Sequence, residues 1–143
     1  MAVAAPKIKK ATFKHIEAEL HSYRDTLREI DQLRKDIMFC SEHTDENVGG
    51  GRSNLPSSPT ERIGTTLVTH RRLQQLETIA NAIQLVYDRV PDDHKKLIQL
   101  KYWTKPQRYT WDGIAEKLHI SKRQAMRWRD EIVYTIAEVL GWR

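Results

Sequence analysis

The chain has 143 residues and a formal net charge of +5, with an isoelectric point near 9.4. This length is enough for one domain, or for a small domain with a helical extension. The charge favours an anionic partner, and no apolar run approaches the ~20 residues of a membrane span, so nucleic acid is favoured over lipid. We expect no secretory signal, and the single cysteine, Cys40, suits a reducing cytoplasm.

The first ninety residues predict two long helices. Residues 1–10 are basic, and we expect them to be disordered. Residues 11–40 then carry apolar side chains at alternating steps of three and four, interrupted only at Arg34, which predicts one long helix with a narrow apolar seam. The seam is a candidate oligomerisation surface and consists of Ile16, Leu20, Tyr23, Leu27, Ile30 and Ile37.

A loop rich in Gly, Pro and Ser, residues 42–60, separates this helix from the next. The second helix is predicted over Thr60–Val90, again with apolar residues at helical spacing. The two helices are similar in length, so they can bury their seams as an antiparallel hairpin or coiled coil within one chain. Each helix can instead pair with its copy in a second subunit. Residues 11–90 are therefore predicted to serve oligomerisation or interaction.

Residues 91–143 predict a separate domain of three helices, Asp92–Trp103, Trp111–Leu118 and Lys122–Leu140. The last two are joined by the short corner His119-Ile120-Ser121, which makes the pair a candidate helix-turn-helix. The predicted fold class is thus all-α, with a long helical hairpin followed by a trihelical domain. Trp103, Trp111 and Trp128 are candidates for the core of that domain.

Capping residues fix the ends of the two final helices. Thr110 is a candidate N-cap for the first, and Ser121 with Gln124 forms the capping-box pattern at the start of the second. His119 stands where such corners usually place Gly, so it is expected to adopt a positive φ. This is the one departure from the usual pattern.

The final helix has one packing face and one basic face. Ala125, Trp128, Ile132 and Ile136 fall on one side, and Arg123 and Arg127 on the other. Arg and Gln can bond bidentately to guanine and adenine edges in the major groove. The predicted base-reading residues are Lys122, Arg123, Gln124 and Arg127, and the predicted phosphate contacts are Thr110, Ser121, Lys105 and Arg108. An ordinary solvated basic helix would have the same pattern.

Other chemistry is not indicated. Cys40 and His43 lack a second pair of metal ligands, and the glycines at 49–51 lack the spacing of a phosphate-binding loop. The carboxylates are interspersed with Lys and Arg, as in surface ion pairs along helices. We therefore expect neither an enzyme nor a bound cofactor or metal.

The chain resembles the RinA/ArpU-type phage transcriptional regulators over nearly its whole length. The resemblance rests on the long N-terminal helix and on three segments, Thr44–Gly51, Ser58–Glu61 and Ile114–Arg129. It implies a DNA-binding activator of late or packaging genes in the cytoplasm of a bacterial host. The C-terminal part also resembles region 4 of sigma factors, in which a helix like Leu97–Trp103 precedes the turn. That similarity implies contact with host RNA polymerase.

Three functions are therefore compared. The first is a sequence-specific regulator that binds double-stranded DNA as a homo-oligomer, with a dimer favoured. The second is a DNA-packaging recognition protein like a terminase small subunit, which a ring-shaped assembly would distinguish. The third is a coiled-coil adaptor that binds no DNA, even at low salt.

Overall fold

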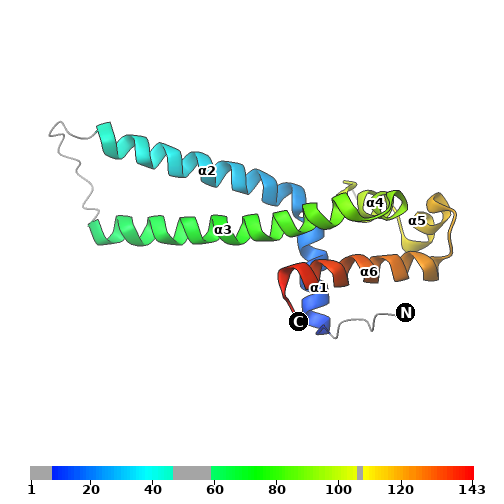
Figure 1. Ribbon diagram of the computed structural model, residues 1–143. Coiled ribbons are helices and arrows are strands. Elements are labelled where there is room, and N and C mark those ends of the chain that lie inside the picture. The colour runs from blue at the N-terminus through cyan, green and yellow to red at the C-terminus, as the bar shows by residue number, and fades with distance from the viewer. Residues whose placement is uncertain (1–7, 47–58, 106–107) are drawn as a thin grey trace. The chain divides into compact units, whose positions relative to one another are not determined.

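The computed structural model describes residues 8–46, 59–105 and 108–143, with side chains over 8–39, 64–105 and 108–143. Within these ranges all regular secondary structure is helical, so the predicted all-α fold class is confirmed (Figure 1). The elements are α1 (Lys10–His21), α2 (Tyr23–Glu46), α3 (Pro59–Arg89), α4 (Asp92–Ile98), the π-helical turn η1 (Gln99–Trp103), α5 (Trp111–Leu118) and α6 (Lys122–Leu140).

Two predicted segments fall mainly outside the described residues, namely residues 1–7 of the basic N-terminus and 47–58 of the Gly-rich loop. At their described edges the helices are longer than predicted. Lys10 already belongs to α1, and α2 continues to Glu46, past the predicted start of the loop at residue 42. The prediction of the loop rests on its Gly, Pro and Ser residues, and its first residues, 42–46, contain none that prevents helix formation.

The chain forms two compact units. The first contains the described parts of residues 1–24 together with 79–143, and the second contains those of 25–78. The first unit therefore combines α1, the end of α3 and every later helix. Residues 10–24 and 79–90, predicted as parts of the long helical pair, group with residues 91–143 in this division.

The prediction of a single helix over residues 11–40 is wrong, because the helix is interrupted at Ser22, between α1 and α2. At this interruption the Leu20 carbonyl accepts a backbone N–H of the helix cap and also the indole Nε1–H of Trp103, at 3.2 Å. The ring of Tyr23 stacks on Trp103, with centroids 5.1 Å apart. Trp103, far along the chain, therefore contacts the end of α1 and the start of α2, which periodicity alone does not predict.

The π-helical turn η1 brings two neighbouring aromatic residues to α1. The Tyr102 hydroxyl donates to Glu17 at 2.8 Å, while Trp103 contacts the end of the same helix. Burial of Tyr102 and the adjacent Glu17 carboxylate raise the pKa of the Tyr102 hydroxyl, so it stays protonated and remains a donor. The helix predicted over Asp92–Trp103 therefore ends in a π-helical turn. Such turns are rare and are found mostly as single turns within α-helices.

The core of the first unit draws on all its helices. Its largest fully buried side chains are Tyr102, Ile16, Leu20, Ile83, Leu97, Ile98, Ile114, Ile132, Ile136 and Val133. Trp103, Trp111 and Trp128, predicted as core, are only partly buried. Helix α1 packs on α6, where Phe13 meets Tyr134 edge-on at 5.9 Å and His15 stacks on Trp142 at 4.7 Å.

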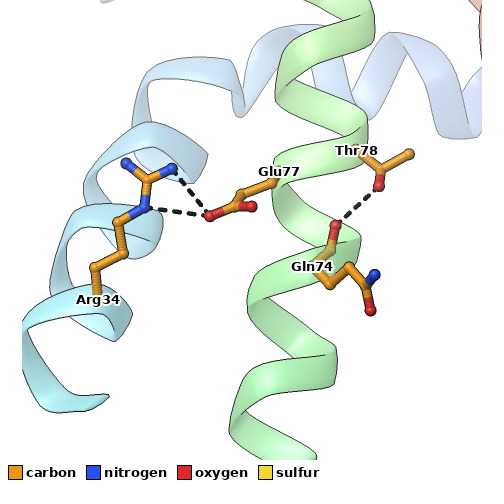
Figure 2. A network of polar contacts seen from close by, with 4 residues as sticks. All are labelled: Arg34, Gln74, Glu77 and Thr78. Atoms are coloured by element: carbon orange, nitrogen blue, oxygen red, sulfur yellow. Dashed lines mark hydrogen bonds and ion pairs between the residues drawn. The ribbon is translucent and has the colours of Figure 1, made fainter. Parts of the chain in front are cut away.

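In the second unit, α2 and α3 run antiparallel and are joined by ion pairs. Arg34 Nη2 lies 2.9 Å from Glu77 Oε1 (Figure 2), and Arg72 pairs with Glu29. Several large apolar side chains remain exposed, including Met38 at 63%, Leu67 at 64% and Val68 at 69%. Single exposed apolar side chains are common on protein surfaces, and only a contiguous patch indicates contact with another macromolecule.

The predicted oligomerisation residues are divided between the units. Ile16, Leu20 and Tyr23 are buried in the first unit by their own chain. The remaining three lie in the second unit and range from buried to exposed, namely Ile30, Ile37 and Leu27.

Because Ile16 is buried within its own chain, truncating its side chain should destabilise the folded monomer. Ile16→Ala should lower the free energy of unfolding by about 2–5 kcal/mol, because it leaves a cavity in a packed core. The loss, measured by denaturant titration, should be the same at every protein concentration. The matched change Leu85→Ala, at a 40% exposed position of the same unit, should cost about 1 kcal/mol or less. A loss at Ile16 that disappears at high protein concentration would place this side chain between subunits.

Candidate nucleic-acid interface

Helix α5 begins where the sequence predicts. Thr110 has extended backbone angles, and its hydroxyl oxygen accepts the Gly113 N–H at 3.2 Å. Asp112 lies in the first turn, where a negative charge is stabilised by the helix dipole. The start of α5 is therefore fixed by a side-chain cap.

The corner after α5 is a left-handed turn at His119, with φ 58° and ψ 41°. The Ile120 N–H bonds the Ala115 carbonyl at 3.0 Å, and the His119 N–H bonds the Glu116 carbonyl at 3.2 Å. These two bonds form a Schellman motif, which satisfies the carbonyls at the helix end. The expected positive φ at His119 is confirmed, although the residue carries a Cβ that this conformation disfavours.

Helix α6 starts at the predicted cap and packs with the predicted face. The Ser121 hydroxyl oxygen accepts the Gln124 N–H at 3.1 Å. Ala125, Ile132 and Ile136 are buried. Trp128 is partly buried and stacks on the ring of His94 from α4, with centroids 4.6 Å apart. The first turns of α6 are thus held in one orientation on α4 and α5.

The opposite side of α6 presents cations to solvent. Lys122, Arg123 and Arg127 are exposed, and Gln124 is partly exposed. Over the described part of the chain, neither Arg123 nor Arg127 has an ion-pair or hydrogen-bond partner for its side chain. Lys122 differs, because its Nζ lies 3.8 Å from Asp112 Oδ2. The structure therefore brings the four predicted base-reading residues together at the start of one helix.

The predicted phosphate contacts lie at the ends of α5 and α6 or just before α5. The Thr110 and Ser121 oxygens act as caps, and each hydroxyl hydrogen stays available for donation. Lys105 and Arg108 are exposed and precede α5. All four positions belong to the first unit.

Other basic residues are engaged by aromatic rings, which the sequence did not indicate. The Arg129 guanidinium lies 5.1 Å from the centroid of Phe13 and 5.4 Å from that of Trp111, and it bonds Asp130 at 2.8 Å. Lys101 lies over Trp111 at 4.8 Å. Such contacts between cations and ring faces stabilise packing. These cations therefore serve the fold, whereas Arg123 and Arg127 do not.

Lys117 is held in a similar way by Tyr109. Its Nζ lies 4.4 Å from the Tyr109 ring centroid and donates to the Tyr109 hydroxyl oxygen at 2.9 Å. The hydrogen bond from Lys117, together with the positive charges of Lys117 and Arg108, lowers the pKa of the Tyr109 hydroxyl.

Asp112 is the neighbour of the basic face that sequence reasoning missed. It lies ten positions before Lys122, across a turn, and no regular helical spacing predicts a contact over that separation. Within the described residues no group of three His, Cys, Asp or Glu side chains could hold a metal ion. Nor does any described helix have the length and apolar character to cross a membrane.

Comparison with known proteins places the chain in a family. Residues 9–138 match the family described as "Protein of unknown function (DUF722)". The chain belongs to the DUF722 family. The protein named "Transcriptional activator rinA" from Staphylococcus phage phi11 is 28% identical over 134 residues, which are 94% of each chain. No solved structure matches this DUF722 chain. The resemblance to RinA-type regulators is thereby confirmed.

The strained corner of this DUF722 protein predicts a stabilising change. His119→Gly should raise the free energy of unfolding by up to about 1 kcal/mol, since Gly adopts a positive φ without a Cβ penalty. His119→Ala keeps the Cβ and is the matched control, without that gain. Thermal or denaturant unfolding measures both variants. Equal stabilities of the Gly and Ala variants would show that the corner stores no strain.

Burial of His21 predicts a dependence of stability on pH. Burial, and then the charge of Lys101, hold the pKa of His21 below its usual value of 6.5. The unfolded chain therefore binds the proton more readily, so stability should decrease as the pH falls below 6.5 and level off below the folded-state pKa. His21→Gln should have a flatter profile of unfolding free energy against pH. An unchanged slope in this variant would contradict the assignment.

Proposed function

We propose that this protein is a sequence-specific DNA-binding regulator that activates phage or prophage transcription. The observation that carries the proposal is the pair of exposed arginines, Arg123 and Arg127, in the first turns of a capped helix whose other face is buried. Side chains placed in this way reach base edges when a helix enters the major groove. The 28% identity to a phage transcriptional activator over 94% of the chain supports the same function.

In this proposal α5 and α6 form the helix-turn-helix. Arg123, Gln124 and Arg127 read bases from the major groove, and Lys122 enters beside them. Thr110, Ser121, Lys105 and Arg108 contact phosphates and set the position of the protein on the duplex. The activator function adds a contact with host RNA polymerase, as the similarity of the C-terminal part to sigma region 4 also indicates.

We also propose that the protein acts as a dimer through its second unit. Ile16, Leu20 and Tyr23 already have partners within their own chain. Leu27 and Ile37 remain for contact with a second copy, and Met38, Leu67 and Val68 are exposed in the same unit. A dimer would present two reading helices to two half-sites, as helix-turn-helix regulators do.

The test is binding to fragments of the genome that encodes the protein, measured by footprinting over a salt series, with the mass in solution from light scattering. We expect discrete protected sites at physiological salt, bound by a dimer. Weak binding to every fragment that disappears with salt would mean attraction to phosphates alone. A ring-shaped assembly would favour a packaging-recognition protein instead.

Two variants separate base reading from phosphate contact. Arg127→Ala should relax discrimination at one position of the site by about 1–3 kcal/mol, because a bidentate base contact is lost. Lys105→Ala should weaken binding on all sequences and reduce the salt slope by about 0.9. Lys14→Ala, an exposed change on α1, is the control and should alter neither quantity. An equal loss on every sequence from Arg127→Ala would remove that residue from base reading.

A further inference from the structure

Asp112 is the acidic side chain beside the proposed reading surface. It extends from the first turn of α5 to within 3.8 Å of the Lys122 ammonium, at the start of α6. Both groups remain accessible, with 76% of the Asp112 side chain and 53% of the Lys122 side chain exposed. The carboxylate therefore lies beside an accessible ammonium group.

The pairing distinguishes Lys122 from its neighbours. Arg123 and Arg127 have no carboxylate partner in the described part of the chain, and Arg129 is committed to Asp130 and to two aromatic rings. Among the predicted base-reading cations of the described chain, only Lys122 must break an ion pair with another residue of the protein to bind DNA. An exposed pair of this kind is weak, so a phosphate or base can displace it, but each displacement has a cost.

We propose that Asp112 weakens sequence-independent binding by competing with phosphate for Lys122. The inference rests on the DNA-binding function proposed above. On mixed-sequence DNA, Lys122 offers only an attraction to the backbone, and breaking the pair with Asp112 offsets part of it. At the correct site, Arg123, Gln124 and Arg127 add base contacts that outweigh this cost. The carboxylate therefore lowers the occupancy of mixed-sequence DNA, while the base contacts keep the correct site bound.

Helix-dipole stabilisation by Asp112 would also explain an acidic residue at this position. The two roles differ in their dependence on Lys122. Competition for phosphate requires the ammonium group, whereas interaction with the dipole of α5 does not. A double-mutant cycle on Asp112 and Lys122 separates them.

The experiment measures binding of the full-length protein to a short duplex of mixed sequence at several salt concentrations. The variants are Asp112→Ala, Lys122→Ala and the double variant, and Glu138→Ala, an exposed carboxylate at the far end of α6, is the matched control. We expect Asp112→Ala to bind about two- to fivefold more tightly than the wild type, with a steeper salt slope. In the Lys122→Ala background the same change should have little effect.

Three results would overturn the proposal. These are unchanged affinity in Asp112→Ala, an equal gain when Lys122 is already Ala, and an equal gain from Glu138→Ala, which would reflect net charge alone. Binding by the wild type reports separately on the proposed function. If the wild type binds no DNA even at low salt, the proposed DNA binding is wrong. If the wild type binds DNA and Asp112→Ala leaves the affinity unchanged, only the role proposed for Asp112 is wrong.

Discussion

The position of α6 depends on the guanidinium of Arg129. This group lies against Phe13 of α1 and Trp111 of α5 and bonds Asp130 on its own helix. Its side chain is only 21% exposed, and a charge removed from water to this extent needs compensation. The carboxylate and the two ring faces supply it, so three helices are held around one cation. Together with the buried face of α6, this arrangement orients the proposed reading face.

Net charge alone does not locate the surface that is proposed to bind DNA. The chain carries 24 Lys and Arg residues, and some of them are used for packing. Lys101, Lys117 and Arg129 lie over aromatic rings within the first unit. Arg123 and Arg127 have no such partners in the described structure, and they share one face of α6. An interface for DNA is better identified by cations that the fold leaves available than by a count of cations.

Because the helix is interrupted at Ser22, α1 belongs to the first unit, whereas the sequence predicted it as part of the long helical pair. Apolar residues at steps of three and four indicate a buried stripe, but they do not identify what covers it. Ile16 and Leu20 are covered by their own chain, while Met38, Leu67 and Val68 stay exposed in the second unit. Any contact with a second copy through the second unit therefore depends on residues that follow the break.

The sequence by itself determined the local features of the candidate site. Thr110 and Ser121 cap α5 and α6, and His119 takes the positive φ at the corner, because each of these depends on residues within a few positions. The periodicity of α6 likewise predicted its buried face, since a helix sets that spacing itself. Only the tertiary structure decided which helices pack together. The bond from Trp103 to Leu20 spans 83 positions, and the pairing of Asp112 with Lys122 crosses a turn, so neither follows from local spacing.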